Sequence, residues 1–197
     1  MEEEKLSVLY SKDVLDFVTV STEYITMLDS LYEYSQESFI KYNLKLLPLL
    51  YMKAHLLPEL EIDEPETIEK FVSEEEWSRI KLQTNKLMGE LDDYKENLGR
   101  FEENEVNALS ENFADIYQDI KDFTSLYSTS VDELMNDAVA EVARTFKEYW
   151  GQRLVNTLRI LHHYFFNEKL DSEVKGEAEE NTENWLTEQR KNEWGIE

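Results

Sequence analysis

A shortage of glycine and proline is the feature that most constrains the fold of this chain. Its 197 residues include five glycines and three prolines. A β-rich chain of this length needs many tight turns, and tight turns depend on these two residues. Hydrophobic residues make up 41% of the chain, enough to build a core in a domain of this size. The composition therefore predicts an all-α protein with a few long helices joined by short loops.

Hydrophobic periodicity divides the chain into about five helices. Steps of 100° per residue place apolar side chains in stripes over residues 12–34, 36–57, 73–98, 110–127 and 130–166. Pro48 should kink or split the second helix because it lacks an N–H group, and the fifth should bend near Gly151. The fifth stripe is the widest, which is typical of a helix covered on several sides. We therefore expect an irregular bundle packed around the fifth helix.

Two regions of different composition follow one another along the chain. Residues 1–170 carry all five stripes and are interpreted as a single helical domain. Residues 171–197 hold nine acidic and three basic residues with few large apolar ones, so we expect an acidic, mobile tail. Its two tryptophans, Trp185 and Trp194, are candidates for docking on the helical domain or on a partner.

The charge of the chain argues against several classes of function. Twenty Lys and Arg residues face 44 Asp and Glu residues, which gives a net charge of −24. Phosphate backbones and anionic lipid surfaces would be repelled, so we expect neither a nucleic-acid nor a membrane partner. There is no cysteine to act as a nucleophile. No apolar run reaches the roughly 18 residues of a membrane span, and the first residues lack a signal-peptide pattern. These features predict a cytoplasmic protein.

Four acidic residues recur at helical spacing in the fourth predicted helix: Glu111, Asp115, Asp119 and Asp122. They fall within roughly 80° of the helical wheel, opposite its apolar half. An amphipathic helix exposes such a face to water, and we interpret most of this stripe in that way. Asp119 lies nearest the apolar border, followed by Asp115. These two are candidates for contacts with a neighbouring helix.

A divalent metal site is the alternative. Mg²⁺ or Mn²⁺ would need carboxylates from more than one helix, and Glu90 and Asp93 of the third predicted helix could join Asp115 and Asp119. Such a set would suit an all-α hydrolase of nucleotides or phosphate esters, in which the metal bridges carboxylates and substrate phosphates. Glu90 and Asp93, however, point away from the apolar stripe of their own helix. Acidic clusters are more often solvated faces, so we expect no metal cofactor.

Arg153 lies within the apolar arc of the fifth predicted helix. A buried guanidinium needs a partner, and the sequence predicts a structural ion pair with Asp115 or Asp119. In the alternative, Arg153, Asn156 and Arg159 together receive an anionic ligand, because guanidinium groups bind carboxylates and phosphates well. We favour the structural pair, since buried charges are usually paired.

Four segments of the chain resemble a bacterial family of about this length, catalogued as domain of unknown function 5063. The segments are "LLPLLYMKAHLLP", "GELDDY", "ADIYQDIKDF" and "YWGQRLVNTLRILHHY". The resemblance spans most of residues 14–166. It implies a helical architecture and a cytoplasmic bacterial protein, and it brings no catalytic residues with it.

Taken together, these features favour a non-enzymatic interaction protein with a partner protein that the sequence does not identify. The metal-dependent hydrolase remains the alternative function. The sequence specifies neither a biological process nor an oligomeric state. The two functions differ in what they predict for Mg²⁺ and Mn²⁺, because only the hydrolase should bind these ions.

Overall fold

A computed structural model describes residues 7–62, 69–95 and 106–168. These residues form six α-helices and one two-stranded sheet, which confirms the predicted all-α class. The helices are α2 (Lys12–Asp29), α3 (Gln36–His55), α4 (Glu74–Met88), α5 (Leu109–Tyr127), α6 (Asp132–Thr145) and α7 (Gly151–His163). Contacts divide the chain into residues 1–160 and 161–197, with the division inside α7. The tail predicted over 171–197 lies outside the described residues.

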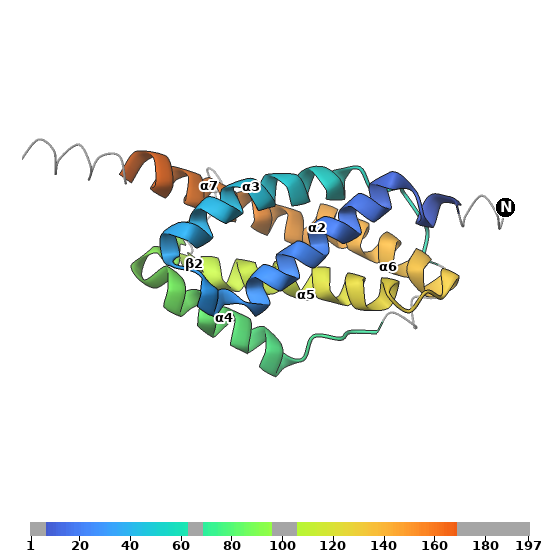
Figure 1. Ribbon diagram of the computed structural model, residues 1–197, viewed down its shortest axis with the longest axis horizontal. Helices are drawn as coiled ribbons and strands as arrows, with labels where there is room; N and C mark the ends of the chain where they lie inside the picture. Colours follow the sequence, from blue (N-terminus) through green and yellow to red (C-terminus); the bar gives the residue numbers. More distant parts are fainter. Residues whose placement is uncertain (1–6, 63–68, 96–105, 169–197) are drawn as a thin grey trace, which may run out of the picture. The chain divides into compact units, whose positions relative to one another are not determined.

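The helix at the centre of the first unit is α5. It packs against α4, α6 and α2, and Figure 1 shows it running between these helices. Its inward side chains are fully buried: Phe113, Ile116, Tyr117 and Ile120. The expectation that residues 130–166 form the central helix was wrong. Residues 132–168 are nonetheless helical throughout, as expected, with π-helical turns at 146–150 and 164–168. These turns break the regular spacing of an α-helix, so a single helical wheel does not describe the whole segment.

Three successive elements follow α5: α6, the π-helical turn η4 (Phe146–Trp150) and α7. A side-chain carbon added at Gly151 would lie only 2.4 Å from the carbonyl oxygen of Phe146. Glycine is therefore required where the chain leaves this turn. Trp150 is fully buried, with its ring 4.7 Å from that of Phe146. A π turn inserts extra backbone into a helix, so it changes which face α7 presents relative to α6.

The third predicted helix is shorter than its apolar stripe. It ends at Met88, because Gly89 adopts φ +57°, a left-handed conformation that favours glycine. A 3₁₀ turn, η3 (Gly89–Leu91), leads into strand β1 (Asp93–Lys95), which pairs antiparallel with β2 (Val106–Ala108). The register pairs Asp93 with Ala108, Tyr94 with Asn107 and Lys95 with Val106. The sequence had predicted no strands.

The first two predicted helices correspond to α2 and α3. The first ends at Asp29 instead of near residue 34, and the 3₁₀ turn η1 (Leu31–Glu33) follows it. The helix α3 continues through Pro48, which does not split it. Proline removes one backbone hydrogen bond of a helix, and the remaining bonds on either side keep α3 continuous.

The second unit is described only at its beginning. Residues Tyr164–Glu168 form a π-helical turn, η5. The rings of His162 and Phe166 lie 4.7 Å apart, and Nδ1 of His163 lies 2.9 Å from Nδ2 of Asn167. These histidines thus have local partners.

Across both units, no described helix combines the length and the apolar composition that crossing a membrane requires.

Candidate functional site

Asp115 lies where α4, α5, η4 and α7 meet. The indole Nε1 of Trp77 donates to its Oδ1 at 2.9 Å. The hydroxyl of Tyr149 and the Nε of Arg153 donate to its Oδ2 at 2.9 and 2.6 Å. The guanidinium of Arg153 also covers the Tyr149 ring, with Cζ 3.7 Å from the ring centroid. We call these four residues the Asp115 cluster.

The carboxylate of Asp115 has its hydrogen bonds supplied by the protein. Its side chain is 14% exposed, and that of Arg153 is 33% exposed, so the guanidinium lies at the rim of the fold rather than in the core as the wheel implied. Burial raises the pKa of Tyr149 to about 12, and the hydrogen bond to Asp115 adds to this shift. Charge-assisted hydrogen bonds from three elements to one carboxylate hold those elements together, which suits a structural role.

The other two members of the predicted Arg153 cluster have different settings. Asn156 is buried, and its Oδ1 accepts a hydrogen bond from Nε2 of Gln152 at 3.0 Å. Arg159 is exposed on α7. The structure thus brings Arg153 to Asp115, and the binding of an anionic ligand by Arg153, Asn156 and Arg159 stays a prediction.

One turn after Asp115, Asp119 faces a small pocket instead of Arg153. The pocket has about 10 Å³ for the centre of a water molecule, room for about one water. Burial raises the pKa of Asp119 to about 6, and the charges of Asp122 and Glu141 contribute to the rise. Lys70 and the hydroxyl of Thr145 act in the opposite direction without cancelling it. We call this site the Asp119 pocket.

Asp122, which lines the same pocket, is buried and not part of a solvent-facing stripe. Its Oδ1 accepts the backbone N–H groups of Phe71 and Val72 at 2.7 and 3.1 Å. The ammonium of Lys70 lies 3.4 Å from its Oδ2. Asp122 therefore holds the segment that precedes α4 against α5. The interpretation of the acidic stripe as a wet face was wrong for this residue, because a non-helical segment covers it.

The four acids of the metal alternative are not gathered into one site. Glu90 and Asp93 are exposed, in η3 and β1, whereas Asp115 is engaged by three protein donors. In residues 7–62, 69–95 and 106–168, no three His, Asp or Glu side chains are placed to hold one metal ion.

The N-terminal end of α5 is held by Asp92, which no pattern in the sequence marks as a functional residue. Its side chain is 2% exposed and accepts the backbone N–H and the hydroxyl of Ser110, both at 2.7 Å. Nδ2 of Asn85 donates to it as well, at 2.7 Å. A carboxylate that accepts the free N–H groups at a helix N-terminus stabilises that end. Asp92, which lies between η3 and β1, thus caps the start of α5.

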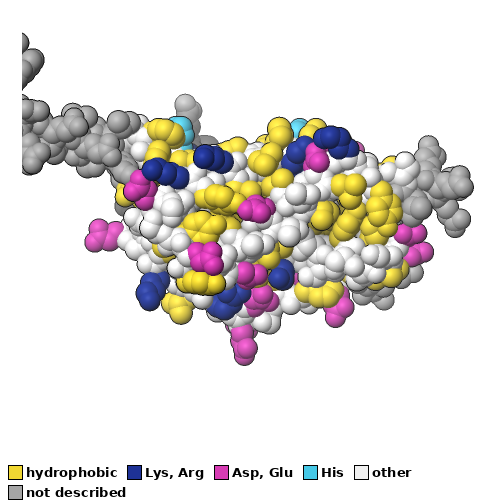
Figure 2. All heavy atoms as spheres, in the orientation of Figure 1, with side chains coloured by type: hydrophobic (Ala, Val, Ile, Leu, Met, Phe, Trp, Pro, Cys, Tyr) yellow, Lys and Arg dark blue, Asp and Glu magenta, His cyan; other side chains and the backbone are white. Residues whose placement is uncertain are grey.

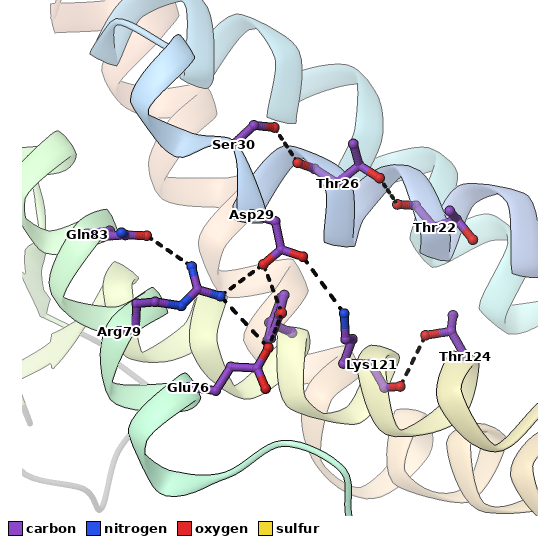
Figure 3. A network of polar contacts seen from close by, with 10 residues as sticks. Thr22, Thr26, Asp29, Ser30, Glu76, Arg79, Gln83, Lys121 and Thr124 are labelled. Carbon is purple, nitrogen blue, oxygen red and sulfur yellow. Dashed lines mark hydrogen bonds and ion pairs between the residues drawn. The ribbon is translucent and has the colours of Figure 1, made fainter.

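A second polar network joins α2, α4 and α5 on the surface shown in Figure 3. Arg79 donates to Asp29 at 2.9 Å, and the Tyr117 hydroxyl lies 3.0 Å from Asp29 and 2.8 Å from Glu76. Lys121 lies 3.8 Å from Asp29. Burial and the two carboxylates raise the pKa of Tyr117 well above its ordinary value. The phenol therefore stays protonated and donates to one carboxylate at a time.

The outward side of α3 carries exposed apolar side chains. Leu49 and Met52 of α3 and Leu56, the residue that ends it, are 38%, 48% and 47% exposed. Leu56 still has helical backbone angles, so the i, i+3, i+7 spacing puts all three on one side of the helix. We call these three residues the α3 face. Thirteen large hydrophobic side chains are exposed in the described residues, and four of them lie between Leu49 and Leu56. The α3 face is thus a concentration of exposed apolar surface.

Comparisons with known proteins agree with the resemblance drawn from the sequence. The family described as "Domain of unknown function (DUF5063)" matches residues 8–167. The fold is similar to the crystal structure of protein BF1032 from Bacteroides fragilis, at 38% identity and a TM-score of 0.74. That similarity covers 81% of this chain and 96% of the other. None of the curated proteins matched the chain.

Proposed function

The chain belongs to the family described as Domain of unknown function (DUF5063), and we propose that it is a non-enzymatic interaction protein that binds a partner protein through the α3 face. A contiguous apolar patch on a soluble protein is often a binding site for another protein. An isolated exposed apolar side chain carries no such meaning. Leu82 of α4 is 69% exposed, more than any residue of the α3 face, but no second large hydrophobic side chain of α4 is exposed.

The observation that carries this proposal is the one-sided spacing of Leu49, Met52 and Leu56. Side chains at i, i+3 and i+7 are the usual anchors when one helix packs against another surface. The charged residues support the proposal indirectly. The carboxylates of Asp115 and Asp122 bind groups of the protein itself, which leaves the α3 face as the clearest unfilled contact surface in the described part of the chain.

Site-specific photo-crosslinking in the organism that carries this chain tests the proposal. A photoreactive phenylalanine analogue in place of Met52 should give a discrete crosslinked product with a partner. The product should disappear when Leu56→Glu is added, because a charge then replaces an apolar contact. Both positions are exposed, so the melting temperature should change little, and this is to be checked on the purified variants.

The matched control places the same analogue at Leu82, which is exposed but lies outside the α3 face. It should give no discrete product. Identical products from positions 52 and 82, or a product that persists with Leu56→Glu, would contradict a binding role for the α3 face.

A further inference from the structure

The charges beside the α3 face are opposite in sign to those of the chain as a whole. The 20-residue helix α3 contains three lysines and a single acidic residue, Glu37, in a chain with 44 acidic and 20 basic residues. Lys45, one turn before Leu49, is exposed. In Figure 2, Lys and Arg side chains are frequent along the upper part of the visible face, with hydrophobic side chains between them. The α3 face is thus apolar with basic edges.

These lysines are only partly neutralised by neighbouring acids. Lys41 lies 2.7 Å from Glu37. Lys53 lies 2.7 Å from Asp16, which also holds Lys12 at 2.8 Å, so one carboxylate serves two ammonium groups. Hydrogen bonds from Lys12 and Lys53 lower the pKa of Asp16 to about 2. Asp16 therefore stays charged, and the charge of Asp13 also acts on Lys12. The excess positive charge beside the α3 face therefore rests mainly on Lys45, which is exposed.

The size of the α3 face favours a short segment as its occupant. Residues 49–56 extend about 10 Å along the helix at 1.5 Å per residue. Three side chains bury roughly a few hundred Å² at most, short of the ~800 Å² that each partner of a stable complex buries. A second copy of the whole chain would need a larger surface. Met52 has a flexible thioether, which adapts to an incoming helix.

On the basis of the proposed function, we infer that the partner segment is an amphipathic helix whose apolar stripe is flanked by Asp or Glu residues. The net charge of −24 repels such a segment at long range. Charges beyond the Debye length of roughly 8–10 Å are largely screened at physiological salt, however. At contact distance, the main charge that the docked segment meets is therefore that of Lys45.

Two synthetic peptides of equal length test this inference against the full chain. Both carry the same leucine stripe; one has Glu and the other has Lys at the flanking positions. Binding is measured by fluorescence anisotropy at low and high salt. The Glu peptide should bind about five-fold more tightly at low salt, as expected for a few exposed ion pairs, and the preference should shrink at high salt. The substitution Lys45→Glu should reduce or invert the preference for the Glu peptide.

A basic peptide can also adhere to the acidic surface elsewhere. Binding is therefore assigned to the α3 face only where Met52→Glu abolishes it. Leu82→Glu is the matched control, because it adds the same charge outside the α3 face and should leave binding unchanged. Failure of both peptides to bind through Met52 would overturn the proposed function. Equal binding, or a preference for the Lys peptide, would overturn the acidic-partner inference alone. A dimer seen by sedimentation and lost with Met52→Glu would replace the peptide segment by a second copy.

Discussion

Asp115 and Asp119 lie one turn apart on α5 and meet very different surroundings. Asp115 accepts hydrogen bonds from Trp77, Tyr149 and Arg153. Asp119 faces a small pocket that it shares with Asp122 and other acids, and its pKa rises to about 6. Two identical side chains on one helix thus occupy a site with three protein hydrogen-bond donors and a site where burial disfavours the charged form.

The difference arises from the elements that cover each turn of α5. The Asp115 cluster draws donors from α4, η4 and α7, so a single carboxylate ties these elements together. The Asp119 pocket lies among several acidic side chains with one lysine, Lys70, beside them. The first site should stabilise the fold through its charge, whereas the second should stabilise it more when the proton is present. Substitutions at each site can therefore separate the two effects.

The largest loss is expected from Asp115→Ala. It leaves the indole N–H of Trp77, the hydroxyl of Tyr149 and the guanidinium of Arg153 without their acceptor. Breaking a buried pair costs about 3–5 kcal/mol, and the partial exposure of Arg153 lowers this to about 3 kcal/mol. Urea unfolding at pH 7 measures the change. Tyr149→Phe removes one donor and should cost about 1 kcal/mol. A loss below that of Tyr149→Phe would show that Asp115 is not the centre of its cluster.

A smaller loss is expected from Asp122→Ala, which removes the acceptor for the N–H groups of Phe71 and Val72. Buried backbone donors without partners destabilise a protein, and we expect about 2 kcal/mol in total. The effect should be local, with faster hydrogen exchange at these two amides. Asp122→Asn keeps one carbonyl oxygen and should recover part of the loss. Unchanged exchange at both amides would contradict the assigned role of Asp122.

At Asp119, the substitution to Asn should stabilise the protein. The carboxyl has a pKa of 3.8 when unperturbed and about 6 in the fold, so the unfolded state ionises first as pH rises. The free energy of unfolding therefore falls as pH rises from about 4 to about 6. Above that window, the full destabilising effect of the charged carboxylate is present. We expect Asp119→Asn to add about 1–2 kcal/mol at pH 7, allowing for partial exposure, and almost nothing at pH 4. Equal gains at both pH values would rule out the titration of Asp119 as the cause.

The sequence predicted part of this contrast. The helical wheel placed Asp115 and Asp119 near the apolar border and Arg153 within an apolar arc, which is enough to suggest a pair. It could not separate the two aspartates, because the π turn η4 decides where Arg153 points. It also placed Asp122 on the polar half, since a wheel describes one helix and takes no account of the non-helical segment around Phe71 that covers this residue.

The ends of the helices also could not be predicted from the apolar pattern of the sequence. The apolar stripe of the third predicted helix continued past Met88, but the positive φ of Gly89 ends α4 and a hairpin follows. Asp92, which lies just before that hairpin, is the residue that caps α5. Periodicity identified which segments are helical, because it reflects burial along one helix. It did not identify the caps and turns, which depend on the conformation of single residues and on neighbours distant in the sequence.

The smallest effect is expected from Mg²⁺ or Mn²⁺, which should shift the melting temperature by less than about 1 °C at millimolar concentration. A ligand that binds only the folded state must raise apparent stability. Asp115 is already engaged by three donors, and the Asp119 pocket has Lys70 beside its carboxylates. NaCl at equal ionic strength controls for screening. A rise of several degrees that Asp119→Asn abolishes would place a metal in the Asp119 pocket, and the hydrolase would then become the better hypothesis.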